Sequence, residues 1–282
     1  MTDDSRIQSA EESSFRKTVN ILLPFLIYFV VHDLAQILLA FLANLSLGAL
    51  GGAYTEFMTE NAATANGLLN ALSLLIGMAA VFPMARRELR WAKVLSEGPE
   101  EKRPGKSMEY ILLAVFAIAF ALGINMLMAL AGLTQVSESY QEVAQRQYGV
   151  ALGVGILIYG VISPLAEEIV FRGLIYNRMR RYFGKMLSVA VCGIMFGVYH
   201  GNLVQGIYGC ILGIAITYSY EWFGSFFAPF LFHAAANTAV FLAGYDKVIK
   251  GNIVTPLNCA VLLAMSAAVL YAMQKTRQKN LT

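Results

Sequence analysis

The stretch EYILLAVFAIAFALGINMLMALAGL, residues 109–133, decides the fold. Its only charged side chain is Glu109, at its start. Because a bilayer offers the backbone no water to hydrogen-bond, an apolar run of about 20 residues is expected to cross it as an α-helix. Comparable apolar stretches occupy residues 19–46, 66–85, 149–179, 186–200, 203–220, 225–244 and 256–273. We therefore predict an all-α fold, a polytopic transmembrane bundle of about eight helices.

Composition supports a membrane protein, with 57% hydrophobic and only 14% charged residues. Soluble domains carry roughly 25% charged residues, and no separate soluble domain fits between the apolar stretches. We divide the chain into a cytoplasmic N-terminal segment, three helices with a basic loop at 86–107, a core of four helices, and a last helix with a cytoplasmic tail. The boundaries are 1–18, 19–148, 149–245 and 246–282.

The distribution of basic residues orients the chain, although the net charge is only +3. Of the 21 lysines and arginines, only Arg146, Lys247 and Lys250 fall on the outside if the N-terminus is inside. Cytoplasmic segments are enriched in lysine and arginine, so both termini are expected in the cytoplasm. The loop 86–107 mixes both charge signs with proline and glycine. We interpret it as a solvated linker and orientation signal, and we expect no nucleic-acid binding.

Small residues indicate how two of the predicted helices pack. Gly193 and Gly197, and likewise Gly209 and Gly213, repeat at the four-residue interval that lets membrane helices approach closely. The cysteines lie in predicted helices without CxxC spacing, so neither a disulfide framework nor a thiolate metal site is indicated. They are Cys192, Cys210 and Cys259.

Ionisable residues at membrane depth are costly, and the segment SPLAEEIVFR at 163–172 contains three of them. Glu168 and Arg172 are four residues apart, which predicts an ion pair on one helix face. Glu167 points about 100° away, so we favour it for chemistry. Pro164 lacks a backbone donor and predicts a kink just before the acids, which could open room for solvent. The alternative explanation is a buried structural ion network.

Two histidines follow in later apolar helices. His200 lies four residues after Phe196, and Asn237 lies four residues after His233, so each pair shares a helix face. A lone histidine on an apolar helix is more often a hydrogen-bonded core residue, but two of them after a Glu-Glu pair favour a site.

A further polar group, His32 and Asp33 with Gln36, lies in the first predicted helix. It could supply a ligand or a proton relay. We favour the alternative, a structural hydrogen bond to a neighbouring helix.

Helix rise allows the depths of these groups to be compared. At 1.5 Å per residue, Glu167 lies about 18 Å from a helix end near Met179, and His200 about 22 Å from one near Lys185. For His233 the depth is about 10 Å or about 18 Å, depending on whether its helix begins near residue 226 or 221. The acid and the imidazoles are therefore expected to converge in one hydrated pocket.

Three motifs occur in order: EExxxR at Glu167, Glu168 and Arg172, then FxxxH ending at His200, then HxxxN from His233 to Asn237. Over about residues 150–245 the chain resembles the CPBP family of CAAX proteases and bacteriocin-processing proteins, also called Abi proteins. The resemblance implies intramembrane proteolysis in which Glu167 with His200 activates a water molecule. His233 and Asn237 would stabilise the oxyanion, and Arg172 would hold Glu168.

The resemblance leaves the metal open. A zinc ion bound by Glu167, His200 and His233 would make the chain a metalloprotease, yet the same residues can act without metal. We lean slightly towards a metal ion. The implied partners are the lipid bilayer and a protein or peptide substrate, either lipidated (CAAX-type) or apolar.

Two other functions compete with proteolysis. An ion-coupled secondary transporter also places acids and histidines near the midplane, although we see no inverted repeat. A non-cleaving membrane protein with an immunity or scaffold role is the other alternative.

Overall fold

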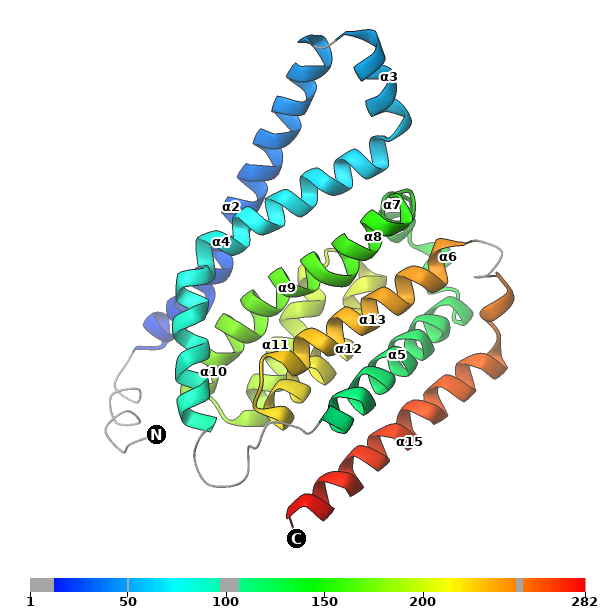
Figure 1. Ribbon diagram of the computed structural model, residues 1–282. Coiled ribbons are helices and arrows are strands. Elements are labelled where there is room, and N and C mark those ends of the chain that lie inside the picture. The colour runs from blue at the N-terminus through cyan, green and yellow to red at the C-terminus, as the bar shows by residue number, and fades with distance from the viewer. Residues whose placement is uncertain (1–12, 50, 97–106, 247–250, 282) are drawn as a thin grey trace. The chain divides into compact units, whose positions relative to one another are not determined.

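The computed structural model describes residues 13–49, 51–96, 107–246 and 251–281, and over these residues the chain is helical and contains no strand (Figure 1). Seven helices in the described part are long and apolar enough to cross a membrane, which confirms an all-α polytopic protein. Their spans are Ser14–Ser46, Ala62–Ala92, Ser107–Leu130, Leu152–Tyr182, Leu203–Phe223, Phe227–Tyr245 and Pro256–Gln278. The eighth predicted span, 186–200, forms an apolar helix, Lys185–Tyr199, of 15 residues. At about 22 Å it is shorter than a bilayer core.

The chain divides into two compact units, Met1–Trp91 with Ala144–Gly184, and Ala92–Val143 with Lys185–Thr282. The predicted core 149–245 contributes to both. Unit 1 contains α2 (Ser14–Ala49), α3 (Gly52–Glu60), most of α4 (Ala62–Ser96), α8 (Leu152–Leu157), η1 (Ile158–Ile162), α9 (Ser163–Glu168), η2 (Ile169–Tyr176) and α10 (Asn177–Tyr182). Unit 2 contains α5 (Ser107–Leu130), α6 (Leu133–Val136), α11 (Lys185–Tyr199), α12 (Leu203–Phe223), α13 (Phe227–Tyr245) and α15 (Pro256–Leu281). The chain passes between the units in α7 (Glu138–Tyr148).

In unit 1, α2 and α4 pack on the helix that carries the two acids. The rings of Phe25 and Phe171 lie 6.0 Å apart, joining α2 to η2. Ala71 of α4 packs in one apolar cluster with Val150 and Ile158. These contacts give the acidic helix an apolar support on two sides.

The loop assignment at 86–107 is wrong over its first part, because α4 continues to Ser96. Glu88, which we placed in a solvated linker, is 1% exposed and ion-paired. The Glu88 carboxylate can be buried there because Arg178 and Arg181 pair with it. Residues 1–12 of the predicted N-terminal segment lie outside the described residues. The same holds for residues 97–106 of the predicted loop and for Lys247 and Lys250.

In unit 2, α5 lies between α13 and α15 (Figure 1), with a core of buried apolar side chains from α5, α12, α13 and α15. Helices α11 and α12 form the close pair that the glycine spacing predicts. A Cβ atom at Gly193 would lie 2.6 Å from the backbone nitrogen of Ile214, and one at Gly213 would lie 2.8 Å from the Gly193 carbonyl. The two backbones are in van der Waals contact, so only the hydrogen atom that serves as the glycine side chain fits between them.

We predict that Gly197→Ala destabilises the protein by about 1–3 kcal/mol, the usual cost of overpacking. Its Cβ would overlap the Gly206 carbonyl and the Cys210 sulfur. Thermal unfolding in detergent should show a lower Tm. The matched control is Gly206→Ala, whose Cβ meets only the Gly197 carbonyl, at 3.8 Å. Equal Tm values for the two variants would contradict close packing of α11 on α12.

Candidate active site

The Glu168 and Arg172 side chains form the predicted ion pair, with Arg172 Nη1 donating to Glu168 Oε1 at 2.7 Å. Both side chains are fully buried. A buried charge is tolerated when it is paired, so the four-residue spacing within one helix neutralises this part of the site. The prediction of this pair from spacing is confirmed.

Glu167 has a different environment. Glu167 is 8% exposed, and the hydroxyl of Ser163 donates a hydrogen bond to its Oε1 atom at 2.6 Å. Ser163 was not among the predicted site residues, although it lies one turn before Glu167, a spacing that places both on one face. This hydrogen bond fixes the orientation of the carboxylate that we favour for chemistry.

The helix that carries these acids is irregular where Pro164 predicts a kink. Segments η1 and η2 are π-helical and flank α9. The backbone N–H of Ser163 donates to the carbonyl of Ile158, five residues earlier. Since Pro164 has no N–H, the chain adopts this longer hydrogen-bond pattern just before it. Such π-helical turns inside α-helices are frequent at functional sites.

A second buried ion network supports the end of the same helix. Glu88 of α4 accepts a hydrogen bond from Arg178 Nε at 3.2 Å and another from Arg181. Arg178 also donates to the carbonyl of Asn20 in α2, and the Asn20 amide donates to the Tyr182 hydroxyl at 2.7 Å. The network therefore joins α2, α4 and α10. Sequence reasoning missed it because the partners are some 90 residues apart.

The polar group of the first helix makes structural contacts. His32 Nδ1 lies 2.9 Å from Asp33 Oδ1, and its ring stacks on Tyr28 at 5.9 Å. Ser73 of α4 donates to the Gln36 side chain at 2.8 Å. The hydrogen bond from α4 to α2 supports the interpretation of this group as a link between helices.

In unit 2, His200 follows the last residue of α11. Gly201 adopts a φ of 71°, the left-handed conformation that ends helices, and Asn202 caps α12 by accepting from the Gln205 N–H at 2.9 Å. His200 Nδ1 lies 2.8 Å from the Phe196 carbonyl. A neutral imidazole that donates from Nδ1 presents its lone pair at Nε2, the arrangement required of a base or a metal ligand.

Phe196 contacts both imidazoles. Its ring centroid lies 4.9 Å from that of His200 and 5.3 Å from that of His233, both nearly edge-to-face. His233 is 3% exposed, and Asn237 lies one turn further along α13 and is partly exposed. His200 and His233 therefore contact the same phenyl ring, although they lie at the end of α11 and in α13, which are separated in the chain by α12.

Glu167, Glu168 and Arg172 belong to unit 1, whereas His200, His233 and Asn237 belong to unit 2. The convergence of the acid with the imidazoles stays a prediction. Within the described residues of either unit, no three side chains of His, Cys, Asp or Glu are grouped to hold a metal ion. By donor chemistry the predicted set fits zinc, since it offers a carboxylate and a ring nitrogen oriented by a carbonyl.

Comparison with known proteins finds a matching family. The family described as "Type II CAAX prenyl endopeptidase Rce1-like" matches residues 149–239, which include every candidate residue of the three motifs. This part of the chain is therefore similar to the CAAX protease family. The chain is 23% identical over 203 residues to YdiL of Bacillus subtilis (strain 168), described as a candidate membrane peptidase. That similarity covers 71% of this chain and 80% of the relative. No solved structure matches the chain significantly.

We predict that Glu88→Gln lowers the free energy of unfolding by about 3 kcal/mol, because it leaves two guanidinium groups without their shared carboxylate. The measurement is thermal unfolding of the purified variant in detergent. Glu60→Gln serves as control, since it removes the same charge from an exposed position in α3. An unchanged Tm for Glu88→Gln would show that the network contributes no stability.

Proposed function

We propose that this chain is a membrane protease of the CAAX protease family and cleaves a peptide bond with water activated by Glu167 and His200. The observation that carries the proposal is the difference between the two adjacent acids. Glu168 is neutralised by Arg172, whereas Glu167 accepts a hydrogen bond from the neutral Ser163 hydroxyl. The Ser163 hydroxyl orients this carboxylate, and a positioned carboxylate can act as a general base towards water.

The imidazoles of unit 2 supply the complementary groups. His200, oriented by the Phe196 carbonyl, would receive or return a proton at Nε2. His233, which packs against the same phenyl ring, and Asn237 one turn later would donate to the developing oxyanion. In this proposal the Phe196 ring sets the separation between His200, which exchanges the proton, and the oxyanion donors His233 and Asn237.

We favour the form of the proposal that includes a zinc ion, and the metal-free form is the alternative. Glu167, His200 and His233 would hold the ion, and when bound it would act as a Lewis acid that polarises water or the scissile carbonyl. In the zinc form His200 Nε2 would bind the metal instead of exchanging a proton, whereas the donor role of Asn237 is the same in either form.

The substrate that we propose is a membrane-associated protein or peptide, cleaved near an apolar or lipidated (CAAX-type) terminus. Apolar helices flank the candidate residues on both sides in the chain, so such a substrate would approach from the bilayer. We further propose that the N- and C-termini face the cytoplasm, as the distribution of basic residues indicates.

Glu167→Gln should lower peptide cleavage by a factor of about 10²–10⁴, the usual contribution of a general base. The measurement is cleavage of a peptide library, with and without C-terminal prenylation, by purified protein in detergent. Glu56→Gln, an exposed acid of α3, is the matched control and should cleave as the wild type does. Cleavage that survives Glu167→Gln would remove this residue as the base.

Measurements of ion-coupled uptake and of cellular activity, made beside the cleavage assay, separate the competing functions. A transporter would show no cleavage by the wild type but ion-coupled uptake that Glu167→Gln abolishes. A binding or immunity protein would keep its cellular activity in both Glu167→Ala and His200→Ala.

Exhaustive chelation should abolish cleavage, and stoichiometric Zn²⁺ should restore it. Metal content of the purified protein provides the second readout: His233→Ala and Glu167→Gln should both retain less zinc than the wild type, because each removes a donor. Cleavage that survives chelation would remove the metal and leave Glu167 and His200 as the acid–base pair.

A further inference from the structure

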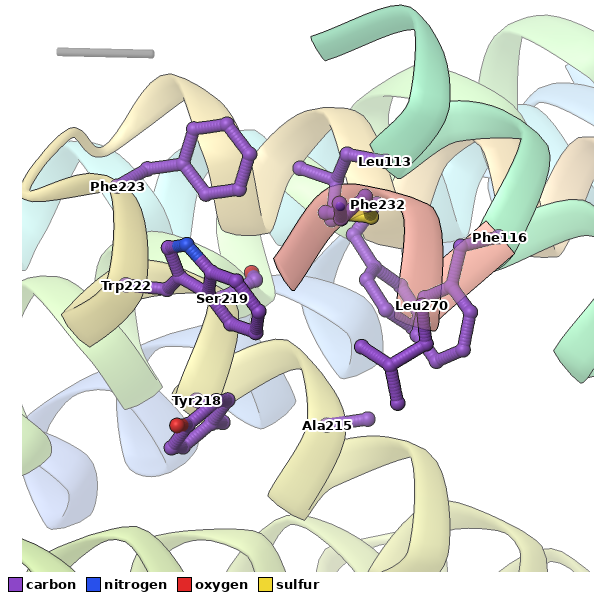
Figure 2. Close-up of a pocket in the computed structure, with 10 residues that line it drawn as sticks. Leu113, Phe116, Ala215, Tyr218, Ser219, Trp222, Phe223, Phe232 and Leu270 are labelled. Atoms are coloured by element: carbon purple, nitrogen blue, oxygen red, sulfur yellow. The ribbon is translucent and has the colours of Figure 1, made fainter. Parts of the chain in front are cut away.

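Unit 2 contains a pocket that none of the candidate catalytic residues lines. Side chains from α5, α12, α13 and α15 point into a common space of about 260 Å³, including its open mouth (Figure 2). Leu113, Phe223 and Phe232 are buried around it, whereas Tyr218 is 40% exposed. Much of this volume is open space at the mouth, so the enclosed part is small and suits a short segment of one hydrocarbon chain.

The lining selects against a polar occupant. Its residues are aromatic or aliphatic, apart from the thioether of Met273, and its polar groups are the hydroxyls of Ser219 and Tyr218 and the indole N–H of Trp222. The Ser219 hydroxyl donates to the carbonyl of Ile216 at 2.7 Å within its own helix. A buried polar ligand would lose its hydration without regaining hydrogen bonds from this wall, whereas an alkyl chain loses nothing.

One side of the pocket has an aromatic rim flanked by two cations. Tyr218 and Trp222 lie one turn apart on α12, with ring centroids 5.7 Å apart. Lys185 Nζ lies 5.7 Å from the Tyr218 centroid, and Arg277 Cζ lies 5.6 Å from that of Trp222. Arg277 also donates to the Trp222 carbonyl. Tyrosine and tryptophan beside basic residues are typical of the headgroup level of a membrane.

A carboxylate accompanies these cations. Glu221 Oε2 lies 3.5 Å from Lys185 Nζ, and the Glu221 side chain is 7% exposed. Lys185 remains 44% exposed, so its ammonium group keeps donors that face outward. An anion at the rim would therefore meet two cations held in place by rings and by one buried acid.

We infer that this pocket binds an anionic phospholipid, with a segment of one acyl chain in the apolar cavity and the phosphate at Lys185 and Arg277. An amphiphile of this kind matches both features, the dry pocket and the cationic aromatic rim. The basic-residue distribution assigns this end of unit 2 to the cytoplasmic side, where anionic lipids attract basic side chains. The lipid site is independent of the proposed catalytic chemistry.

The test is photolabelling of the full chain in nanodiscs with phosphatidylglycerol that carries a diazirine in its acyl chain. Labelled peptides should come from α12 and α15, and the phosphatidylcholine analogue should label several-fold less. Removing each cation should lower labelling about fivefold, so Lys185→Gln with Arg277→Gln should reduce it strongly. Arg90→Gln, which removes an exposed cation of α4, is the control and should label as the wild type does.

A second pair of variants tests the cavity. Ala215→Leu fills it and should reduce labelling, whereas Ala268→Leu adds the same atoms to an exposed position of α15 and should not. If Ala215→Leu or the double variant at Lys185 and Arg277 fails to fold, a competition experiment on the wild type replaces it. Unlabelled phosphatidylglycerol should displace the probe, and phosphatidylcholine should not. Equal labelling or equal displacement by the two lipids would overturn the anionic site, and labels mapped elsewhere would overturn the pocket.

Discussion

The need to pair every buried charge governs this structure. Glu168 and Arg172 lie on one apolar helix with no exposure at all, in a setting where an uncompensated charge costs several kcal/mol. Their four-residue spacing lets the same helix supply both partners. The neighbouring acid, Glu167, which we propose as the base, accepts a hydrogen bond from the hydroxyl of Ser163.

The same constraint explains the support around that helix. Glu88, Arg178 and Arg181 bring three charges together at the junction of α2, α4 and α10. Since no single helix contains these partners, satisfying their charge requires the helices to dock. The charge pairing that keeps Glu88 buried thus also fixes the helix from which Glu167 projects, and a rigid helix positions a functional group better than a loop does.

In unit 2 the corresponding constraint is close packing. Glycines at 193, 197, 209 and 213 bring the backbones of α11 and α12 into contact. A Cβ at Gly209 would lie 3.0 Å from the Cα of Gly197 and, at 3.4 Å, in van der Waals contact with the Nδ1 atom of His200. Phe196 then separates His200 from His233 at ring-contact distance. Packing of small residues in unit 2 positions nitrogen donors, as charge pairing in unit 1 positions a carboxylate.

The sequence by itself determined the relations that lie within about four residues of one another: the apolar helices, the Glu168–Arg172 pair, the shared face of Phe196 and His200, and the irregularity before Pro164. Helix periodicity and the lack of a proline N–H set these locally. Only the tertiary structure decided that Glu88 is buried, that α4 extends to Ser96, and that His233 contacts the same ring as His200. Counting residues from the start of α13 at Phe227 places His233 only about 9 Å along its helix, against about 22 Å for His200. Depth along one helix does not fix where helices cross, because crossing depends on side chains that are far apart in the sequence.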